Sequence, residues 1–191
     1  MLTVITPCTR PYNLPLIMDN LSKLNVQVEW IIIYDKNVIS EVDTRIALYS
    51  NPNIKLVLLC EYNDNTYGKA GYLRNIGMEM ATGDYILFLD DDTVVSNSFY
   101  QGIKPYLGNY DLIVYNQARA GKPIFTGNTY NISDLDTGQV IVKNGLNARW
   151  NKIGKLREER AYFNDVFKEV SKEKIIYIPV VLSYYNFLRH G

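Results

Sequence analysis

The first half of the chain contains four short apolar runs. In the clearest of these runs, apolar and polar residues do not alternate as they would in a strand with one face in water. Strands that are apolar on both faces are typical of a parallel sheet covered by helices on two sides. The expected strands are residues 2–6, 26–34, 54–60 and 85–89, and segments with helical spacing lie between them at 15–24, 68–81 and, more weakly, 38–49. The pattern predicts an α/β fold with right-handed crossovers.

The second half is less regular. Helices are expected at 97–107 and 156–170, and strands at 111–116 and at 174–178, where Pro179 should end the strand. Residues 117–151 are rich in Gly, Asn, Thr and Asp and predict short antiparallel strands, including 138–142 closed by an Asn-Gly turn. We expect a single domain with a nucleotide-binding lobe over 1–92 and a smaller acceptor-side lobe over 93–191. The abrupt end of the sequence leaves open that the chain is a fragment of a longer protein.

Composition and charge exclude several classes of protein. Of 191 residues, 47% are hydrophobic and 21% are charged, which is the balance of a globular domain and not of a disordered or fibrous chain. Twenty basic residues balance twenty acidic ones, so a duplex-DNA binder held by many phosphate contacts is not expected. The N-terminus has no basic segment before its short apolar run, and no run reaches the ~20 residues of a membrane span. These features favour a cytoplasmic protein that binds no nucleic acid.

The two cysteines test the strand order. If the strands are arranged 3-2-1-4, one strand separates the ends that carry Cys8 and Cys60. Two strand spacings are about 9.6 Å, which is beyond the usual Cα separation of a disulfide. We therefore expect reduced thiols, as is usual in the cytosol.

Polar side chains follow the predicted strands at the points where ligands bind in open parallel sheets. Arg10 comes shortly after the first strand, Asp35 after the second, Lys69 in the segment after the third, and an Asp-Asp-Asp sequence at 90–92 after the fourth. The carboxyl ends of parallel strands share one edge, so these groups should gather there.

The three aspartates are the most informative of these groups. Adjacent carboxylates repel one another, and placing them after a buried strand raises their desolvation cost. A solvated turn or a helix cap is the alternative. Their position favours a Mg²⁺ or Mn²⁺ site, since these cations take one or two carboxylates together with substrate phosphates. If the segment is extended, Asp90 and Asp92 face one way and Asp91 the other.

Residues 73–92, LRNIGMEMATGDYILFLDDD, resemble the signature of GT-A fold glycosyltransferases of the family-2 type. That signature has an Arg-Asn or Ala-Asn helix, a Gly-Asp turn, an apolar strand and a DxD motif. The segments VITPCTRP at 4–11 and WIIIYD at 30–35 resemble the same family, and the Phe-x-Asp-Asp-Asp form is similar to the animal glucuronyltransferases. The resemblance covers about the first half of the chain. It implies a Rossmann-like sheet with helices on both faces and a small antiparallel second lobe.

The resemblance implies roles for individual residues on the donor side. Thr6 and Pro7 would line a uridine pocket, and Asp35 would accept a hydrogen bond from the uracil N–H. Arg74 would lie near the nucleotide or the donor sugar. A solvated loop carboxylate and a surface helix residue are the alternatives for Asp35 and Arg74.

Within the DxD motif, Asp90 or Asp91 would approach the ribose or sugar hydroxyls. Asp92 would bind the metal, with Asp90 as a second ligand. Arg10 and Lys69 are candidates for stabilising the charge that develops on the leaving diphosphate, although both fit solvated loop positions equally well.

Other candidates lie late in the chain. Asp165, at the centre of FNDV, and the pair Glu158-Glu159 are candidates for a general base, and Asp165 is the one we select. A solvated helix face is the alternative for Asp165, and a retaining enzyme would need no base. The lone histidine, His190, is a candidate third metal ligand or phosphate contact, with a frayed terminus as the alternative.

These observations predict a glycosyltransferase that uses Mn²⁺ or Mg²⁺. It would move a hexosyl or deoxyhexosyl unit from a UDP-sugar, with UDP-glucose as the default, to a saccharide acceptor in glycan biosynthesis. Trp150, Tyr130 and Tyr162 are candidates for the acceptor side because aromatic faces stack on sugars. A sugar-1-phosphate nucleotidyltransferase and a non-catalytic nucleotide-sugar-binding module are the alternatives.

Overall fold

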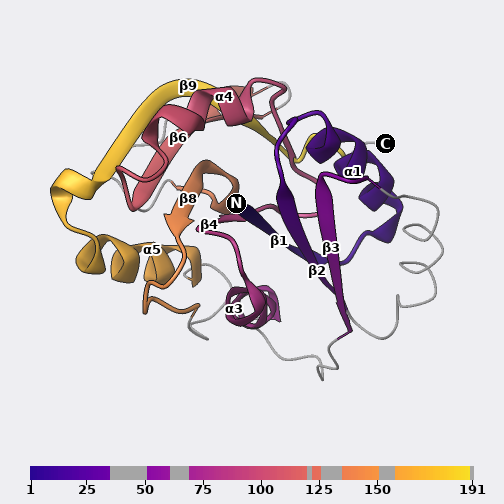
Figure 1. The fold of residues 1–191 in the computed structure, drawn as a ribbon, viewed down its shortest axis with the longest axis horizontal. Coiled ribbons are helices and arrows are strands. Elements are labelled where there is room, and N and C mark those ends of the chain that lie inside the picture. Colours follow the sequence, from indigo (N-terminus) through magenta and orange to yellow (C-terminus); the bar gives the residue numbers. More distant parts are fainter. Residues whose placement is uncertain (35–50, 61–68, 120–121, 126–134, 151–157, 190–191) are drawn as a thin grey trace.

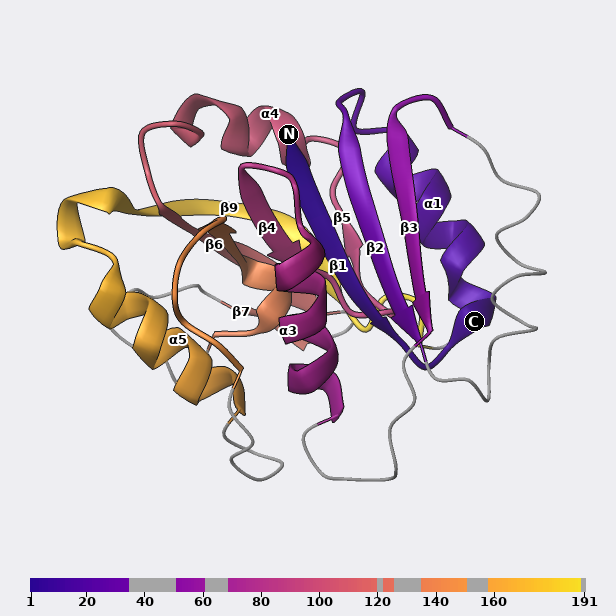
Figure 2. The ribbon, with the colours of Figure 1, turned by 60° about the horizontal axis from the view of Figure 1, so that its bottom comes forward.

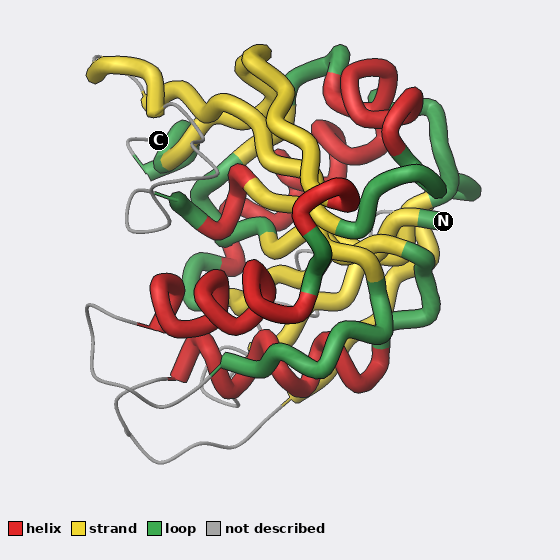
Figure 3. The backbone as a smooth tube through the Cα atoms, turned by 90° about the vertical axis from the view of Figure 1, so that its left-hand side faces the viewer, coloured by secondary structure: helices red, strands yellow, loops and turns green. Residues whose placement is uncertain are grey.

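The computed structural model of the chain describes residues 1–34, 51–60, 69–119, 122–125, 135–150 and 158–189. Within these residues nine strands form one sheet (Figure 1), in the order β3-β2-β1-β4-β8-β6-β9-β5, with β7 paired to β6. In Figure 3 the strands run between helices on either side. The fold is a mixed α/β architecture built on one sheet, as the sequence predicted. The helical segment expected at 38–49 lies outside the described residues.

The parallel part of the sheet agrees with the expected order. It consists of β1 (Leu2–Cys8), β2 (Val28–Tyr34), β3 (Ile54–Cys60) and β4 (Tyr85–Phe88), in the order β3-β2-β1-β4. Figure 2 shows the two covering helices, α1 (Leu14–Ser22) and α3 (Lys69–Met80), on opposite faces. Neither cysteine forms a disulfide, which confirms the prediction of reduced thiols.

The apolar runs bury both of their faces where strands flank them. In β2, Trp30 and Ile32 belong to the core under α1, whereas Ile31 and Ile33 belong to the core under α3. The strand β3 differs because it is the edge of the sheet, and most of its residues are only partly buried. A continuous apolar run did not distinguish this edge strand from a central one.

The helix α3 approaches the sheet closely at Gly77. A Cβ at that position would lie 2.5 Å from Ile5 Cγ2 and 2.9 Å from Ile33 Cδ1. Only a glycine leaves room for this contact, so Gly77 fixes the distance between α3 and the sheet. The same helix carries Arg74 toward the carboxyl edge.

The second half of the chain extends the same sheet. The strand β8 (Val140–Lys143) pairs antiparallel with β4 on one side and with β6 (Leu112–Arg119) on the other. The strand β8 begins later than the expected residue 138, because Thr137–Gln139 form a 3-10 turn capped by Asp136. The remaining elements are β5 (Val94–Val95), α4 (Phe99–Ile103), β7 (Lys122–Phe125), α5 (Glu158–Glu169) and β9 (Ile175–Tyr185).

Pro179 does not end its strand, contrary to the prediction. The strand β9 continues to Tyr185 because its register against β6 shifts around the proline, with Tyr115 opposite Ile178 and Asn116 opposite Val181. The bulge leaves Pro179 exposed and outside the ladder, so its missing N–H costs no hydrogen bond. The extra length carries the chain back to the carboxyl edge of β4. None of the described helices is long and apolar enough to span a membrane.

Candidate active site

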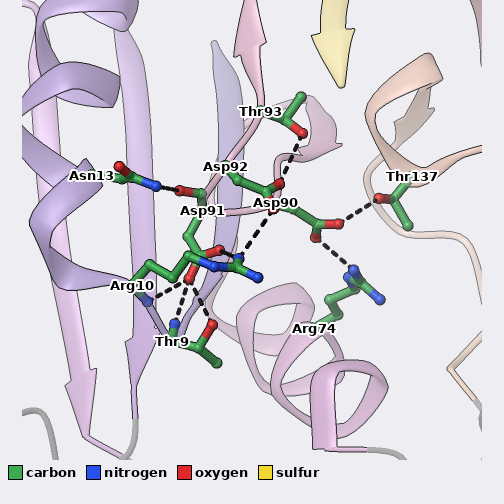
Figure 4. Close-up of polar contacts among 9 residues, drawn as sticks. All are labelled: Thr9, Arg10, Asn13, Arg74, Asp90, Asp91, Asp92, Thr93 and Thr137. Atoms are coloured by element: carbon green, nitrogen blue, oxygen red, sulfur yellow. Dashed lines mark hydrogen bonds and ion pairs between the residues drawn. The ribbon is translucent and has the colours of Figure 1, made fainter. Parts of the chain in front are cut away.

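A cavity of about 350 Å³ opens at the carboxyl ends of β1 and β4. Four segments meet there: the loop after β1, the first turns of α3, the aspartate turn after β4 and the turn after β9. Its walls include six predicted site residues: Pro7, Arg10, Arg74, Asp90, Asp91 and Asp92. The structure thus brings together groups from three separate parts of the sequence. Figure 4 shows the polar contacts that organise them.

Asp91 points away from its two neighbours and toward the loop after β1. Its Oδ2 accepts hydrogen bonds from the backbone N–H groups of Thr9 (2.5 Å) and Arg10 (2.7 Å) and from Thr9 Oγ1 (2.9 Å). Its Oδ1 accepts one from Arg10 Nη1 at 2.5 Å. The carboxylate is buried, and its acceptor capacity is taken up by this loop. Asp91 therefore joins the β1 loop to the aspartate turn.

Asp90 faces α3 and the turn before β8. Its Oδ1 accepts a hydrogen bond from Arg74 Nη2 at 2.7 Å, and Thr137 Oγ1 lies 3.5 Å from its Oδ2. Its side chain remains 30% exposed, so the second oxygen is accessible from the cavity. Asp90 is the most open carboxylate of the three.

Asp92 lies on the opposite wall. Arg10 Nη1 is 3.1 Å from its Oδ2, and the Asn186 amide, oriented to satisfy its neighbours, donates to the same carboxylate at 3.1 Å. The Asp92 carbonyl accepts the backbone N–H of Leu188, which ties the turn after β9 to the aspartate turn. Burial raises the pKa of Asp92, the negative charges of Asp90 and Asp91 raise it further, and the positive charges of Arg10 and Arg189 lower it. A bound cation would relieve this repulsion.

The residues of the aspartate turn fit a hard divalent cation. Mg²⁺ and Mn²⁺ need only one or two carboxylates when a diphosphate supplies further oxygens. Asp90 and Asp92 provide these donors at one cavity, and the burial of the Asp92 carboxylate beside two further aspartates favours a cation there. Among the described residues there is no group of three or more His, Cys, Asp or Glu side chains that could hold a metal without a substrate.

Arg74 is held in place by an aromatic wall. Its guanidinium carbon lies 4.5 Å from the centre of the Trp150 ring, and Trp150 stacks on Tyr162 with centroids 4.2 Å apart. Asn75 holds the backbone of Trp150 with two hydrogen bonds of 2.8 Å. Trp150 and Tyr162 are buried, so they support Arg74 and do not present open faces for a sugar. Tyr130, the third aromatic candidate, lies outside the described residues.

Of the other donor-side and metal-site candidates, only some lie at the cavity in the described part of the structure. Pro7 lines the cavity, whereas Thr6 is fully buried in β1 and accepts a hydrogen bond from Trp30 Nε1 at 3.0 Å. Asp35, His190 and the side chain of Lys69 lie outside the described part of the structure.

The base candidates lie about two turns apart on α5, with Glu158 and Glu159 in its first turn and Asp165 in its second half. Asp165 is 3.3 Å from Lys168 and lines a separate surface depression with Arg149 and Glu169. The N-terminus of α5 instead packs on α3, since Glu158 Oε2 lies 2.9 Å from where a Cβ on Gly71 would be.

Glu159 interacts electrostatically with the cavity. Glu159 is exposed on α5, but partial desolvation by its neighbours raises its pKa, the Arg74 guanidinium lowers it, and the charges of Asp90 and Glu158 raise it. The charges of Arg74 and Asp90, which line the cavity, thus act on Glu159.

Sequence reasoning missed two groups of residues at this site. Asn186 and Arg189 line the cavity because β9 runs past Pro179, and no motif marked them. Asp136 caps the turn before β8, where Gly138 N and Gln117 Nε2 donate to its Oδ1. Burial and the nearby charge of Asp90 raise the pKa of Asp136 to about 7. An Asp one residue before Thr-Gly is a helix-cap signal, but only the fold brings it near Asp90.

Solved structures share this architecture. The crystal structure of residues 1–349 of S. aureus TarS in complex with UDP-GlcNAc superposes with a TM-score of 0.77 at 15% identity, over 96% of this chain and 57% of that one. The same TarS segment with UDP gives a TM-score of 0.72 at 16% identity, over 96% of this chain and 59% of that one. The crystal structure of a mycobacterial protein gives a TM-score of 0.62 at 13% identity, over 95% of this chain and 66% of that one. The chain thus spans between 57% and 66% of the length of these structures.

No curated protein matches the sequence. The sequence family described as "Glycosyl transferase family 2" matches residues 26–175, which include α3, the aspartate turn and the N-terminus of α5. The match spans well over half of the chain, and the fold and the cavity described above agree with it. The chain belongs to glycosyl transferase family 2.

Proposed function

We propose that the protein is a metal-dependent glycosyltransferase that moves a hexosyl or deoxyhexosyl unit from a UDP-sugar to a saccharide acceptor. The observation that carries the proposal is the cavity in which Asp90 and Asp92 face Arg10 and Arg74 at the carboxyl edge of the parallel strands. Membership of the family and the fold shared with a TarS structure that holds UDP-GlcNAc support a nucleotide-sugar donor. UDP-glucose and UDP-GlcNAc are the first donors to test.

On the donor side, Asp92 and Asp90 would hold Mn²⁺ or Mg²⁺ against the diphosphate. The ion would neutralise the charge that develops on the leaving group as the glycosidic bond breaks. Arg74, fixed by Asp90 and Trp150, directs a permanent positive charge at the same cavity. Pro7 lies at the base of the wall where we place the uridine, and Asp35 retains its proposed role toward the uracil.

On the acceptor side we propose Glu159, in place of Asp165, as the general base. A base of this kind removes the acceptor proton as the hydroxyl attacks, and it works best when its pKa is raised toward neutrality. The proposal is supported by the raised pKa of Glu159, by the action of the Arg74 and Asp90 charges on it, and by the packing of the N-terminus of α5 on α3 at Gly71. This assignment implies inversion at the anomeric carbon.

The test is release of UDP from UDP-glucose and UDP-GlcNAc, measured with Mn²⁺ and with EDTA, in the presence of saccharide acceptors. We expect Mn²⁺-dependent release and a glycosylated product by mass spectrometry, and loss of both in Asp92→Asn. Binding of UDP without release would support a non-catalytic module. Formation of UTP with pyrophosphate would support a nucleotidyltransferase, which the family match already disfavours.

A further inference from the structure

Arg10 contacts two of the three aspartates through a single nitrogen. Its Nη1 lies 2.5 Å from Asp91 Oδ1 and 3.1 Å from Asp92 Oδ2 (Figure 4). The two contacts are not equivalent, because Asp91 also binds the Arg10 backbone N–H at 2.7 Å and two groups of Thr9. Asp91 therefore holds both the backbone N–H and one guanidinium nitrogen of Arg10, whereas Asp92 contacts only the guanidinium.

Among the described residues, Arg10 is the cation within ion-pair distance of Asp92, and the charge of Arg189 also stabilises this carboxylate. The carboxylate is 6% exposed, and the other donors that reach it, the Asn186 amide at 3.1 Å and Thr93 Oγ1 at 3.4 Å, are neutral. Two further carboxylates precede it in the chain. Without a cation near its Oδ2, this buried charge would be strongly unfavourable.

Arg10 also has room to change partners. Its side chain is 29% exposed at the cavity wall, whereas that of Arg74 is 5% exposed and is clamped between Asp90 and the Trp150 ring. A guanidinium offers five donors in a planar fork, which suits a diphosphate as well as a carboxylate. Arg10 thus stays tied to Asp91, while its partly exposed guanidinium can exchange Asp92 for another anion in the cavity.

We infer that Arg10 is an internal counter-cation that a divalent metal ion displaces from Asp92, and that the displaced guanidinium then binds the donor diphosphate. This inference rests on the proposed function, since it needs a cation on Asp92 and a diphosphate in the cavity. Asp91 keeps Arg10 at the site during the exchange. Metal and nucleotide would then bind cooperatively, and each would raise the affinity for the other by the same factor.

The test compares wild type with Arg10→Gln, because the inference predicts effects of opposite sign. Mn²⁺ alone, followed through the electron paramagnetic resonance signal of free Mn²⁺, should bind Arg10→Gln about fivefold or more tightly than wild type. UDP in saturating Mn²⁺, followed by calorimetry, should bind it about fivefold or more weakly. A merely structural role for Arg10 would weaken both. Lys104→Gln, which makes the same charge change at an exposed residue outside the cavity, should alter neither.

A second measurement uses wild type, so that it stands even if Arg10→Gln fails to fold. In nuclear magnetic resonance spectra of arginine side chains, titration with Mg²⁺ alone should shift the Arg10 Nε resonance and accelerate rotation of its guanidinium. The Arg74 resonance should change less, because both Asp90 and Trp150 hold it. If Mg²⁺ binds but the chemical shift and the guanidinium rotation of Arg10 stay unchanged, the inference is overturned.

The two proposals fail in different ways. Equal Mn²⁺ affinities in wild type and folded Arg10→Gln, with Mn²⁺-dependent UDP binding retained, would contradict the counter-cation role alone. UDP binding that no metal influences in any variant would contradict the metal dependence in the proposed function, and the counter-cation role with it.

Discussion

Glu29 is a buried carboxylate whose loss should destabilise the fold far from the cavity. It is fully buried in β2 and accepts four hydrogen bonds: from Thr3 Oγ1 (2.7 Å), Lys55 Nζ (2.7 Å), Thr82 N (2.7 Å) and Thr82 Oγ1 (2.6 Å). These bonds join β1, β2 and β3 to the turn that precedes β4. Burial opposes ionisation, but the donors, led by Lys55, lower the pKa of Glu29 from 4.5 to about 2.

The size of the effect follows from this shift in pKa. A depression from 4.5 to about 2 corresponds to about 3 kcal/mol of folding free energy that is fully present above pH 4.5. The unfolded chain takes up its proton first as the pH falls, so this stabilisation is lost progressively between pH 4.5 and pH 2. By pH 3, about 2 kcal/mol of it should be gone.

The assay is urea unfolding of wild type and Glu29→Gln at pH 7 and pH 3. The variant should be less stable by about 3 kcal/mol at pH 7, since its amide cannot satisfy all four donors, and this difference should shrink by about 2 kcal/mol at pH 3. Glu79→Gln, at an exposed position of α3, is the matched control. Identical pH dependence in wild type and Glu29→Gln would refute the reasoning.

Three further predictions concern packing, catalysis and thiol chemistry. Gly77→Ala should destabilise the fold by about 1–3 kcal/mol in the same urea assay, because its methyl group would meet Ile5 and Ile33; unchanged stability would mean that α3 can move away. Glu159→Gln should slow transfer about 100-fold or more with little effect on UDP binding, whereas Asp165→Asn should leave the rate unaltered, and the reverse pattern would restore Asp165 as the base. Ellman's reagent should modify exposed Cys60 in the folded protein and buried Cys8 only after unfolding; equal rates for both would contradict the burial of Cys8.

The sequence predicted the parallel half of the sheet well because its signals are local. Each signal lies within the element that it predicts. The signals are the apolar runs of strand length, the helical spacing that includes Gly77, and the Gly-Asp turn before β4. The predicted strand order β3-β2-β1-β4 is confirmed, and so are the helices around residues 15–24 and 68–81.

The features that escaped prediction depend on partners distant in the sequence. A proline usually ends a strand, but the bulge opposite Tyr115 and Asn116 lets β9 pass Pro179. This continuation is what brings Asn186 to the cavity. Alternate faces for the three aspartates were expected only if the segment were extended, but residues 90–93 form a turn in which Thr93 N donates to the Asp90 carbonyl at 3.0 Å. The partners of Asp91 in the β1 loop become visible only in the fold.

The family resemblance predicted that Arg74 lies near the donor site. It did not predict the Trp150 ring that holds the Arg74 guanidinium in place. Nothing in the local sequence connects Asn75 to residue 150, and the stack of Trp150 on Tyr162 joins two segments of the second half of the chain. Tertiary packing thus makes Trp150 and Tyr162 structural residues that support Arg74.

The most direct test of the account is a crystal structure of the protein with UDP and Mn²⁺. We predict a manganese anomalous peak between the carboxylates of Asp90 and Asp92 and the diphosphate, with Arg74 on the opposite side of the phosphates. UDP bound elsewhere, for example in the apolar pocket between Leu2, Tyr85 and Leu107, with the aspartate turn left without metal or phosphate, would contradict it.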